Sequence, residues 1–391
     1  MDISSHVREE LDNPAPESPD TYTLEEHNTV IPDEHSMGKT LREYIYQRIH
    51  QEIKRPEWQT IRVTDSLQRD PPAIISSWEI KKQPTPFNFR RPTATIIDDS
   101  TLEIHCFPCP AFVRHYSRVI STYLQFENRA TKVETLIPTD LVSENVLRQS
   151  NLSELGATDV VIFGEVHRLT QLVSGITWGS QHPNGLFAWH TFESEGGKSI
   201  TLLGCRESLW GEAAGSLVRI LREFSKIQCL IYVSKVGSLA ENVSANERIA
   251  TGCRSTFEDE DKDITWDDPL RDIKLIALSD LVLRGRLVSV PSPLCETKEW
   301  LGQWQETCAW VDCETWHMAQ AAKDVKVKFG YLHIVSDNLA EENGENLSNE
   351  DCNGIQSKRE KLFREIEIIL RQFIKTWDTQ NAINTIVTES T

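Results

Sequence analysis

Residues 159–164 read DVVIFG, a continuous apolar run that ends in glycine. A strand that is buried on both faces of a parallel sheet has this pattern, because neither face meets water. Two further apolar runs, 229–233 (CLIYV) and 330–335 (GYLHIV), have the same character. Residues 211–224 lie between the first two runs and carry apolar side chains at helical spacing. This alternation predicts an α/β fold with a mixed, mostly parallel central sheet flanked by helices.

The same alternation extends through most of the chain. It predicts further strands at 101–107, 132–137, 187–193, 199–203, 273–277 and 286–290, and helices at 39–53, 111–126, 140–155, 299–307, 314–323 and 358–377. Five prolines from position 71 to position 92 interrupt it. We therefore expect an acidic disordered tail (1–38), a helix with a Pro-rich linker (39–92), an N-terminal α/β extension (93–156) and a main domain (157–380) with acidic loops at 257–269 and 338–354.

The charge of the chain is strongly acidic and unevenly distributed. Its 391 residues include 41 Lys and Arg against 59 Asp and Glu, a net charge of −18. The excess lies in the tail and the two acidic loops, which are predicted to be mobile or solvated. Docking of a partner by the tail is the alternative. An acidic chain argues against general binding to nucleic acid or anionic membranes, and no apolar run reaches the roughly 18 residues of a membrane span.

The cysteines point to a reducing compartment. The chain has nine, an odd number, and its acidic N-terminus lacks the apolar stretch of a signal peptide. We therefore expect reduced thiols and a cytoplasmic protein. Cys106 and Cys109 lack a second cysteine pair, and Cys308, Cys313 and His317 lack a fourth ligand, so no metal site is predicted.

Four segments follow one another in an informative order. They are 160–172 (VVIFGEVHRLTQL), 197–221, 229–252, and 285–322 together with 331–338 (YLHIVSDN). In this order they resemble the purine/uridine nucleoside phosphorylase superfamily, which includes the methylthioadenosine nucleosidases. The resemblance covers a little over half of the chain and identifies a divergent member. It implies an enzyme that cleaves the N-glycosidic bond of a purine nucleoside or related compound, forms a homo-oligomer, and needs no cofactor beyond phosphate as a co-substrate.

The resemblance assigns roles to residues near the end of the main domain. Glu314 matches the glutamate that bonds the ribose hydroxyls, and a carboxylate suits a diol because its two oxygens accept two hydrogen bonds. Cys313 stands where the family has a methionine under the sugar. Asp337 matches the acid that protonates the leaving purine at N7, with Ser336 in support. The alternatives are a helix-terminus acid for Glu314 and a turn-capping residue for Asp337.

The segment after the first strand carries two candidates for activating water. The nucleosidases have a catalytic glutamate a few residues past the glycine, where this chain has Glu165 and His167. The spacing here is shorter and does not choose between them. The alternative is a solvated strand end.

The phosphate site of the family is altered. Tyr232, Ser234 and Lys235 occupy the segment where the phosphorylases carry an arginine that clamps phosphate. Lys235 is a candidate anion ligand, nucleophile or base, or an ordinary surface lysine. Arg206 replaces a glycine of the Gly-rich turn, and Trp316 is one candidate to replace the family's base-stacking aromatic.

Three functions remain open from the sequence. The first is a nucleosidase or phosphorylase with an altered phosphate site. The second is the same scaffold repurposed for biosynthetic chemistry on an anionic or amino-acid-like substrate. The third is a non-catalytic nucleoside-sensing module. All three take a small nucleoside-like or anionic molecule as partner.

Overall fold

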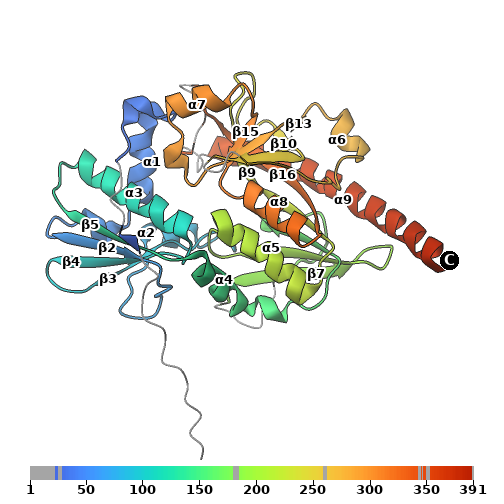
Figure 1. Ribbon diagram of the computed structural model, residues 1–391, viewed down its shortest axis with the longest axis horizontal. Helices are drawn as coiled ribbons and strands as arrows, with labels where there is room; N and C mark the ends of the chain where they lie inside the picture. The colour runs from blue at the N-terminus through green and yellow to red at the C-terminus, as the bar shows by residue number, and fades with distance from the viewer. Residues whose placement is uncertain are drawn as a thin grey trace, which may run out of the picture.

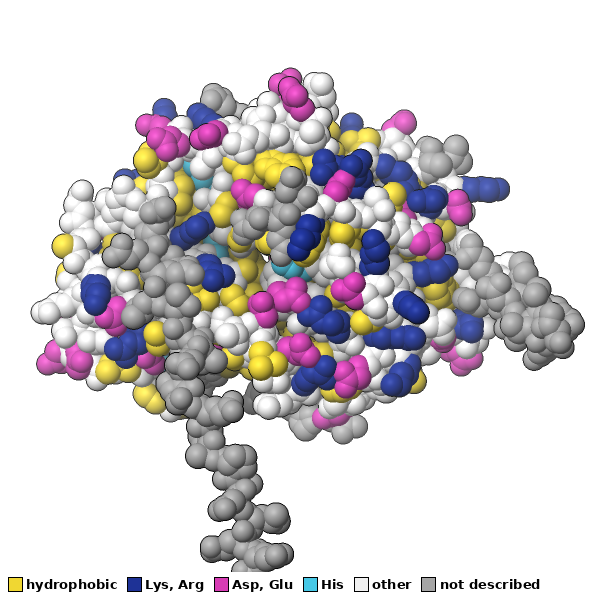
Figure 2. All heavy atoms as spheres, viewed as in Figure 1, with side chains coloured by type: hydrophobic (Ala, Val, Ile, Leu, Met, Phe, Trp, Pro, Cys, Tyr) yellow, Lys and Arg dark blue, Asp and Glu magenta, His cyan; other side chains and the backbone are white. Residues whose placement is uncertain are grey.

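The chain forms two sheets covered by helices (Figure 1). The computed structural model describes residues 23–24, 29–178, 185–258, 262–341, 345, 347–348 and 353–389. Parallel pairs predominate in the main sheet, and the N-terminal sheet has parallel pairs at its centre and antiparallel pairs at its two edges. The predicted α/β class with a mixed, mostly parallel sheet is confirmed. On the face drawn in Figure 2, Lys and Arg side chains are interspersed with Asp and Glu.

The N-terminal sheet has five strands in the order β1-β5-β2-β4-β3. Their bounds are Thr23–Leu24 (β1), Lys132–Ile137 (β5), Thr60–Thr64 (β2), Thr101–His105 (β4) and Thr93–Ile96 (β3). Helices α1 (Leu41–Arg48) and α3 (Pro110–Phe126) pack on it, and α2 (Ser77–Lys82) follows β2. Because β2 lies at the centre of this sheet, the sheet crosses the boundary predicted at residue 92.

The main sheet is organised around one long strand, β9. This strand, Cys229–Ser238, runs parallel to β6 (Val160–Gly164) on one side and to β16 (Lys328–Asn338) on the other. Beyond β6 lie β8 (Ser199–Cys205) and β7 (Phe187–Glu193), and beyond β16 lie β10 (Ile249–Thr251) and β13 (Val282–Arg284). The far end of β9 pairs with β15 (Trp310–Asp312), which continues to β14 (Leu287–Ser289), β11 (Arg254–Phe257) and β12 (Lys262–Thr265).

Helices cover both faces of the main sheet. On one face lie α4 (Asp140–Arg148), α5 (Gly211–Ser225) and α8 (Thr315–Asp324), and α5 and α8 pack side by side (Figure 1). On the other face lies α9 (Asn353–Glu389), whose stripe from Leu362 to Trp377 is buried. Two short helices, α6 (Lys274–Leu278) and α7 (Lys298–Trp304), lie in the connections between strands of the main sheet. Burial of one apolar stripe per helix is what holds the layers together.

Several segments differ from the sequence-based expectation. Residues 273–277, predicted as a strand, overlap the helix α6. Part of the acidic loop 257–269 is the strand β12, paired with β11. The end of the predicted disordered tail is packed, with His35 fully buried. The predictions for residues 1–22, 25–28, 259–261, 342–344, 346 and 349–352 lie outside the described residues. Among the described helices, none is both long and apolar enough to cross a membrane.

Candidate active site

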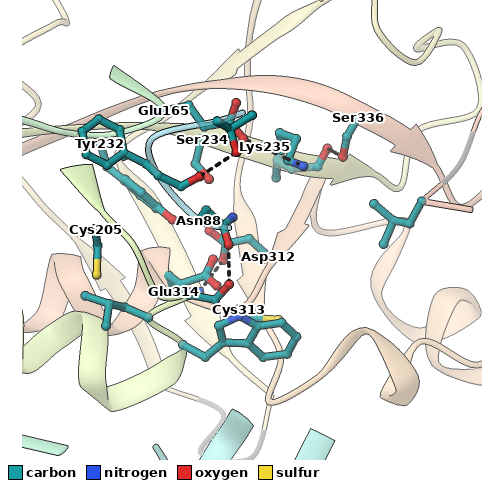
Figure 3. Close-up of a pocket in the computed structure, with 18 of the residues that line it drawn as sticks. Asn88, Glu165, Cys205, Tyr232, Ser234, Lys235, Asp312, Cys313, Glu314 and Ser336 are labelled. Carbon is teal, nitrogen blue, oxygen red and sulfur yellow. Dashed lines mark hydrogen bonds and ion pairs between the residues drawn. The ribbon is translucent and has the colours of Figure 1, made fainter. Parts of the chain in front are cut away.

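A cavity of about 510 Å³ lies where β6, β9, β15 and β16 and the residues that follow them carry most of the residues singled out from the sequence. In open α/β sheets, ligands bind beyond the carboxyl ends of the strands. Nine residues singled out from the sequence line this cavity: Glu165, His167, Tyr232, Ser234, Lys235, Cys313, Glu314, Ser336 and Asp337. In Figure 3, Glu165, Ser234, Lys235 and Ser336 lie along one side of the view, and Asp312, Cys313 and Glu314 lie along the other. The fold therefore brings together segments that are up to 172 residues apart in the sequence.

Two predicted site residues lie away from the cavity. Arg206 turns its guanidinium to the carbonyl oxygen of Gly185, to which it donates a hydrogen bond. Trp316 lies in the first turn of α8, where its Nε1 donates to the carbonyl oxygen of Lys262 at 3.0 Å and its ring stacks on Phe257. Neither side chain lines the cavity. The structure therefore removes both from the candidate site.

Gly164, the last residue of β6, lets the chain turn tightly beside β9. Its φ is +114°, and a Cβ at this position would lie 2.2 Å from the carbonyl oxygen of Val233. The next residue, Glu165, donates its backbone N–H to that same oxygen at 2.8 Å. Only glycine fits here, because a side chain would meet backbone and would adopt a strained conformation. The glycine thus places Glu165 at the cavity wall.

Glu165 lies in a positively charged environment. Its Oε1 is 3.9 Å from Nζ of Lys235. Burial alone would raise the pKa of Glu165, but the positive charges of Lys235, Arg359 and Arg168 outweigh it and leave the pKa below the ordinary value. Glu165 is therefore a carboxylate at neutral pH.

His167, unlike Glu165, is uncharged at neutral pH. Burial lowers its pKa, although the charge of Glu165 opposes this effect. Its ring packs edge-on against Phe87 at 5.8 Å, and its Nδ1 is buried without a hydrogen-bond partner among the described residues. His167 is therefore a neutral imidazole at neutral pH.

Tyr232 and Ser234 lie on β9, side by side in the cavity wall. Burial, followed by the charge of Glu314, raises the pKa of Tyr232 well above its ordinary value, so the phenol is neutral. Its ring is held between Phe163 at 5.6 Å and His333 at 4.8 Å. The backbone N–H of Ser234 donates to Nδ1 of His333 at 3.1 Å. These contacts hold Tyr232 and Ser234 in place at the cavity.

The turn between β15 and α8 presents Cys313 and Glu314 to the cavity. Asp312 holds this turn because its Oδ1 accepts from the Ser289 hydroxyl at 2.7 Å and from the Glu314 backbone N–H at 3.3 Å. It also accepts from the backbone N–H and the hydroxyl of Thr315, as a capping carboxylate does. Burial and the charge of Asp312 raise the pKa of Glu314 well above its ordinary value, despite the opposing charge of Lys235.

Asp337 and Ser336 lie at an irregularity in β16. The register between β16 and β9 shifts between Val335 and Asp337. Such a bulge redirects side chains, and here both Ser336 and Asp337 line the cavity. The Ser336 hydroxyl donates to Oδ1 of Asp337 at 2.5 Å, and Asp337 is buried.

One wall of the cavity, which no sequence pattern indicated, comes from the N-terminal unit, that is, the N-terminal sheet with helices α1, α2 and α3 and the segments that join them. Lys81, Lys82, Phe87 and Asn88 all line it. The backbone N–H of Asn88 donates to the carbonyl oxygen of Cys205 at 2.9 Å, so this segment continues alongside the end of β8. The ring of Phe87 lies 2.4 Å from where a Cβ on Gly204 would be, so the ring packs where that glycine lacks a side chain. The prolines marked an extended segment, but nothing in the sequence indicated where it docks.

Three further ionisable residues at the cavity were also missed. Arg168 and Arg359 add positive charge beside Glu165, and Glu296 adds a buried carboxyl group. Their positions depend on contacts between distant segments, and they form no local motif. In the part of the chain that the structure describes, no cluster of three or more His, Cys, Asp or Glu side chains has the arrangement of a metal site.

Comparison with known proteins gives structural neighbours only. No family model and no curated protein matches the chain. The 5'-methylthioadenosine/S-adenosyl homocysteine nucleosidase of Campylobacter jejuni is similar with a TM-score of 0.45 and 11% identity over 55% of this chain and 100% of that chain. A futalosine hydrolase mutant of Helicobacter pylori is similar with a TM-score of 0.44 and 15% identity, over 56% of this chain and 100% of that chain. The nucleosidase of Neisseria meningitidis in complex with methylthio-immucillin-A is similar with a TM-score of 0.43 and 15% identity, over 56% of this chain and 99% of that chain. Each of these comparisons covers little more than half of this chain.

Proposed function

We propose that the cavity hydrolyses the N-glycosidic bond of a purine nucleoside or a related compound. The observation that carries this proposal is the convergence of an ionised Glu165, the carboxyl group of Glu314 and the buried Asp337 on one cavity. Cleavage of such a bond needs a proton for the departing base, stabilisation of an oxocarbenium-like sugar, and an activated nucleophile. These three carboxyl groups supply one function each.

Asp337 is the general acid in this scheme. As the bond between the sugar C1' and the base nitrogen breaks, its electron pair passes to the base. A proton from Asp337 neutralises the base at N7, so a neutral purine leaves. The hydroxyl of Ser336, which donates to Oδ1 of Asp337, holds the carboxyl group in one orientation. Proton donation of this kind contributes roughly 10²–10⁴-fold to a rate.

Glu314 and Tyr232 bind the sugar. Both line the cavity, and Glu314 is the residue that the family resemblance assigns to the ribose hydroxyls. Because its two carboxyl oxygens hydrogen-bond to adjacent hydroxyls, Glu314 orients the ring. The neutral phenol of Tyr232 offers a further donor in the same wall.

Glu165 is the group that activates water in this scheme, and the neutral imidazole of His167 is the alternative base. A general base must lack its proton at the working pH, and Glu165 meets this condition because nearby positive charges keep it ionised. Water adds its oxygen to C1', and its proton passes to Glu165. The products are the free base and the free sugar, and exchange with solvent returns the proton from Glu165 and restores it to Asp337.

A chromatographic assay of base release tests this proposal. The protein is incubated with adenosine, inosine, guanosine, uridine and methylthioadenosine, each with and without phosphate. We expect free purine base without phosphate. Base that appears only with phosphate would make the enzyme a phosphorylase, with Lys235 and Arg168 as the anion ligands. A folded protein that binds these nucleosides without releasing base would be a sensing module.

A second candidate is different chemistry on an anionic or amino-acid-like substrate. One observation favours it: Lys235, Arg168 and Arg359 all line the cavity and place positive charge near Glu165. Basic side chains in a cavity wall suit an anionic group on a ligand. Absence of base release from every nucleoside in the assay would favour this candidate.

Lys235→Met should change the pH dependence of base release. The variant removes the positive charge 3.9 Å from Glu165. Less positive charge then counteracts the effect of burial, so the pKa of Glu165 rises. Because the base must be ionised, the acidic limb of the profile should move to higher pH by about 1 unit or more. Lys132→Met, at an exposed position of the N-terminal sheet, is the matched control and should leave the limb in place. An unmoved limb in Lys235→Met would exclude Glu165 as the base.

A further inference from the structure

Asn88 is a polar residue that the N-terminal unit places at the cavity, and neither the resemblance nor the proposed function gives it a role. It is exposed and lines the cavity. In Figure 3, Asn88 lies between Lys235 and Glu314 in the view. The preceding residue, Phe87, is buried and packs its ring on Gly204. Asn88 is therefore a residue that a molecule bound in the cavity can contact.

Backbone contacts with the main domain hold Asn88 in place. Its N–H donates to the carbonyl oxygen of Cys205 at 2.9 Å, and the N–H of Arg90 donates to the carbonyl oxygen of Arg206 at 3.1 Å. The backbone of Asn88 has a φ of +49°, a left-handed conformation that asparagine tolerates better than most other residues. The position of Asn88 is therefore set by hydrogen bonds to the end of β8.

The orientation of the side-chain amide follows from its two partners. Nη1 of Arg91 lies 3.4 Å from Oδ1 of Asn88. Because a guanidinium group only donates hydrogen bonds, the amide atom that faces Arg91 must be the oxygen. The Ser208 hydroxyl donates to the same oxygen at 2.5 Å. These two donors fix which end of the amide is the oxygen and leave the nitrogen Nδ2 on the other side.

The nitrogen Nδ2 of Asn88 is a donor that a ligand can use. Among the residues that the structure describes, the side chain of Asn88 makes its hydrogen bonds through Oδ1. An amide nitrogen carries two N–H groups and accepts no hydrogen bond, so it selects an acceptor on the ligand. The ligand group that meets Asn88 must therefore offer a lone pair.

The partner of Asn88 belongs to the segment that adjoins the proposed sugar-binding wall. Three residues after Ser208, the backbone N–H of Gly211 donates to the carbonyl oxygen of Cys313 at 3.0 Å, and Glu314 comes next in the chain. A sugar hydroxyl that donates its proton to Glu314 keeps two lone pairs on its oxygen. A donor such as Nδ2 of Asn88 can bind one of these lone pairs. Glu314 and Asn88 together thus supply an acceptor and a donor, which is what a hydroxyl group needs.

We propose that Asn88 binds the sugar of the nucleoside by donating a hydrogen bond from Nδ2 to the oxygen of one sugar hydroxyl. This inference rests on the proposed function in taking a nucleoside as the ligand and Glu314 as the sugar-binding group. The N-terminal unit then takes part in selecting the ligand, because a sugar that lacks this hydroxyl leaves the donor of Asn88 without its partner. Asn88 is in this account a residue that determines specificity for the sugar.

Ligand binding by Asn88→Gly tests the inference in the full-length protein. Glycine adopts the positive φ without strain and removes the amide. Calorimetry in an Asp337→Asn background, which slows turnover, gives the Kd of adenosine, inosine and guanosine, and then of the 2'-, 3'- and 5'-deoxy analogues of the tightest binder. We expect Asn88→Gly to raise the Kd of that nucleoside about 2–10-fold. The Kd of the analogue that lacks the bonded hydroxyl should not change, and the other two analogues should show the full loss.

Asn128→Gly is the matched control. Asn128 also has a positive φ, of +51°, and it is exposed after the end of α3 and outside the cavity. The same substitution there changes the same kind of backbone position and removes the same amide. Its Kd values should equal those of the background protein.

The outcomes separate this inference from the proposed function. Unchanged affinity of a folded Asn88→Gly protein, or an equal loss for all three deoxy analogues, would overturn the inference and leave the proposed reaction as it stands. The expected pattern of Kd values without base release by the wild type would refute only the reaction. Absence of binding of all three nucleosides to the folded protein would refute both.

Discussion

Asp337→Asn is expected to reduce base release by about 10²–10⁴-fold and to leave the fold intact. Asparagine has nearly the same size and can still accept a hydrogen bond from Ser336, but its amide has no proton to give to the leaving base. The departing purine would then leave as an anion, which raises the barrier. The measurement is the initial rate of free base formation from the best substrate, with folding checked by circular dichroism and thermal midpoint.

The control for this variant is Asp267→Asn. It makes the same chemical change at a side chain that is 76% exposed and lies outside the cavity. We expect its rate to equal that of the wild type. A folded Asp337→Asn protein that retains its rate would remove Asp337 from the chemistry and would favour the second candidate function.

Gly164→Ala is expected to lower the free energy of unfolding by about 3 kcal/mol or more. The added methyl group would lie 2.2 Å from the carbonyl oxygen of Val233, and the backbone φ of +114° is strained for any residue other than glycine. Relief of the clash must shift β6 relative to β9, which changes the position of Glu165 at the cavity, so base release should fall as well. Urea unfolding, followed by circular dichroism, measures the change in stability.

Gly302→Ala is the matched control for stability. Gly302 lies within the helix α7, and no atom lies within 4 Å of the Cβ that alanine would add. Alanine is the better helix former, so this variant should be more stable than the wild type by about 0.5–1 kcal/mol. A Gly164→Ala protein with unchanged stability would contradict the close approach of β6 to β9.

Apolar patterns predicted the parts of the fold in which one segment buries a large surface. The strands β6 and β9 and the helices α5 and α9 were identified because each has a long run or stripe of apolar residues. The pattern failed for short elements. Residues 273–277 are mostly apolar, but so short a segment does not distinguish a strand from a helical turn, and the three-residue β15 carries no periodicity.

The candidate site was predictable where functional residues follow a strand directly. Glu165 and Asp337 belong to strand ends, and Glu314 follows a strand at the start of a helix, so sequence order alone suggested them. Arg206 was misplaced because its direction is set by a contact with Gly185 that no local pattern shows. Glu296 was missed because its position depends on His35, which lies more than 250 residues earlier in the chain.

The masses of both products formed from a purine nucleoside in ¹⁸O-labelled water distinguish hydrolysis from every alternative. We expect free base together with free sugar that carries one ¹⁸O atom, formed in the absence of phosphate and lost in Asp337→Asn. If an unlabelled sugar 1-phosphate forms when phosphate is added, the reaction is phosphorolysis and not hydrolysis. Intact nucleoside after prolonged incubation with folded protein would contradict glycosidic cleavage altogether.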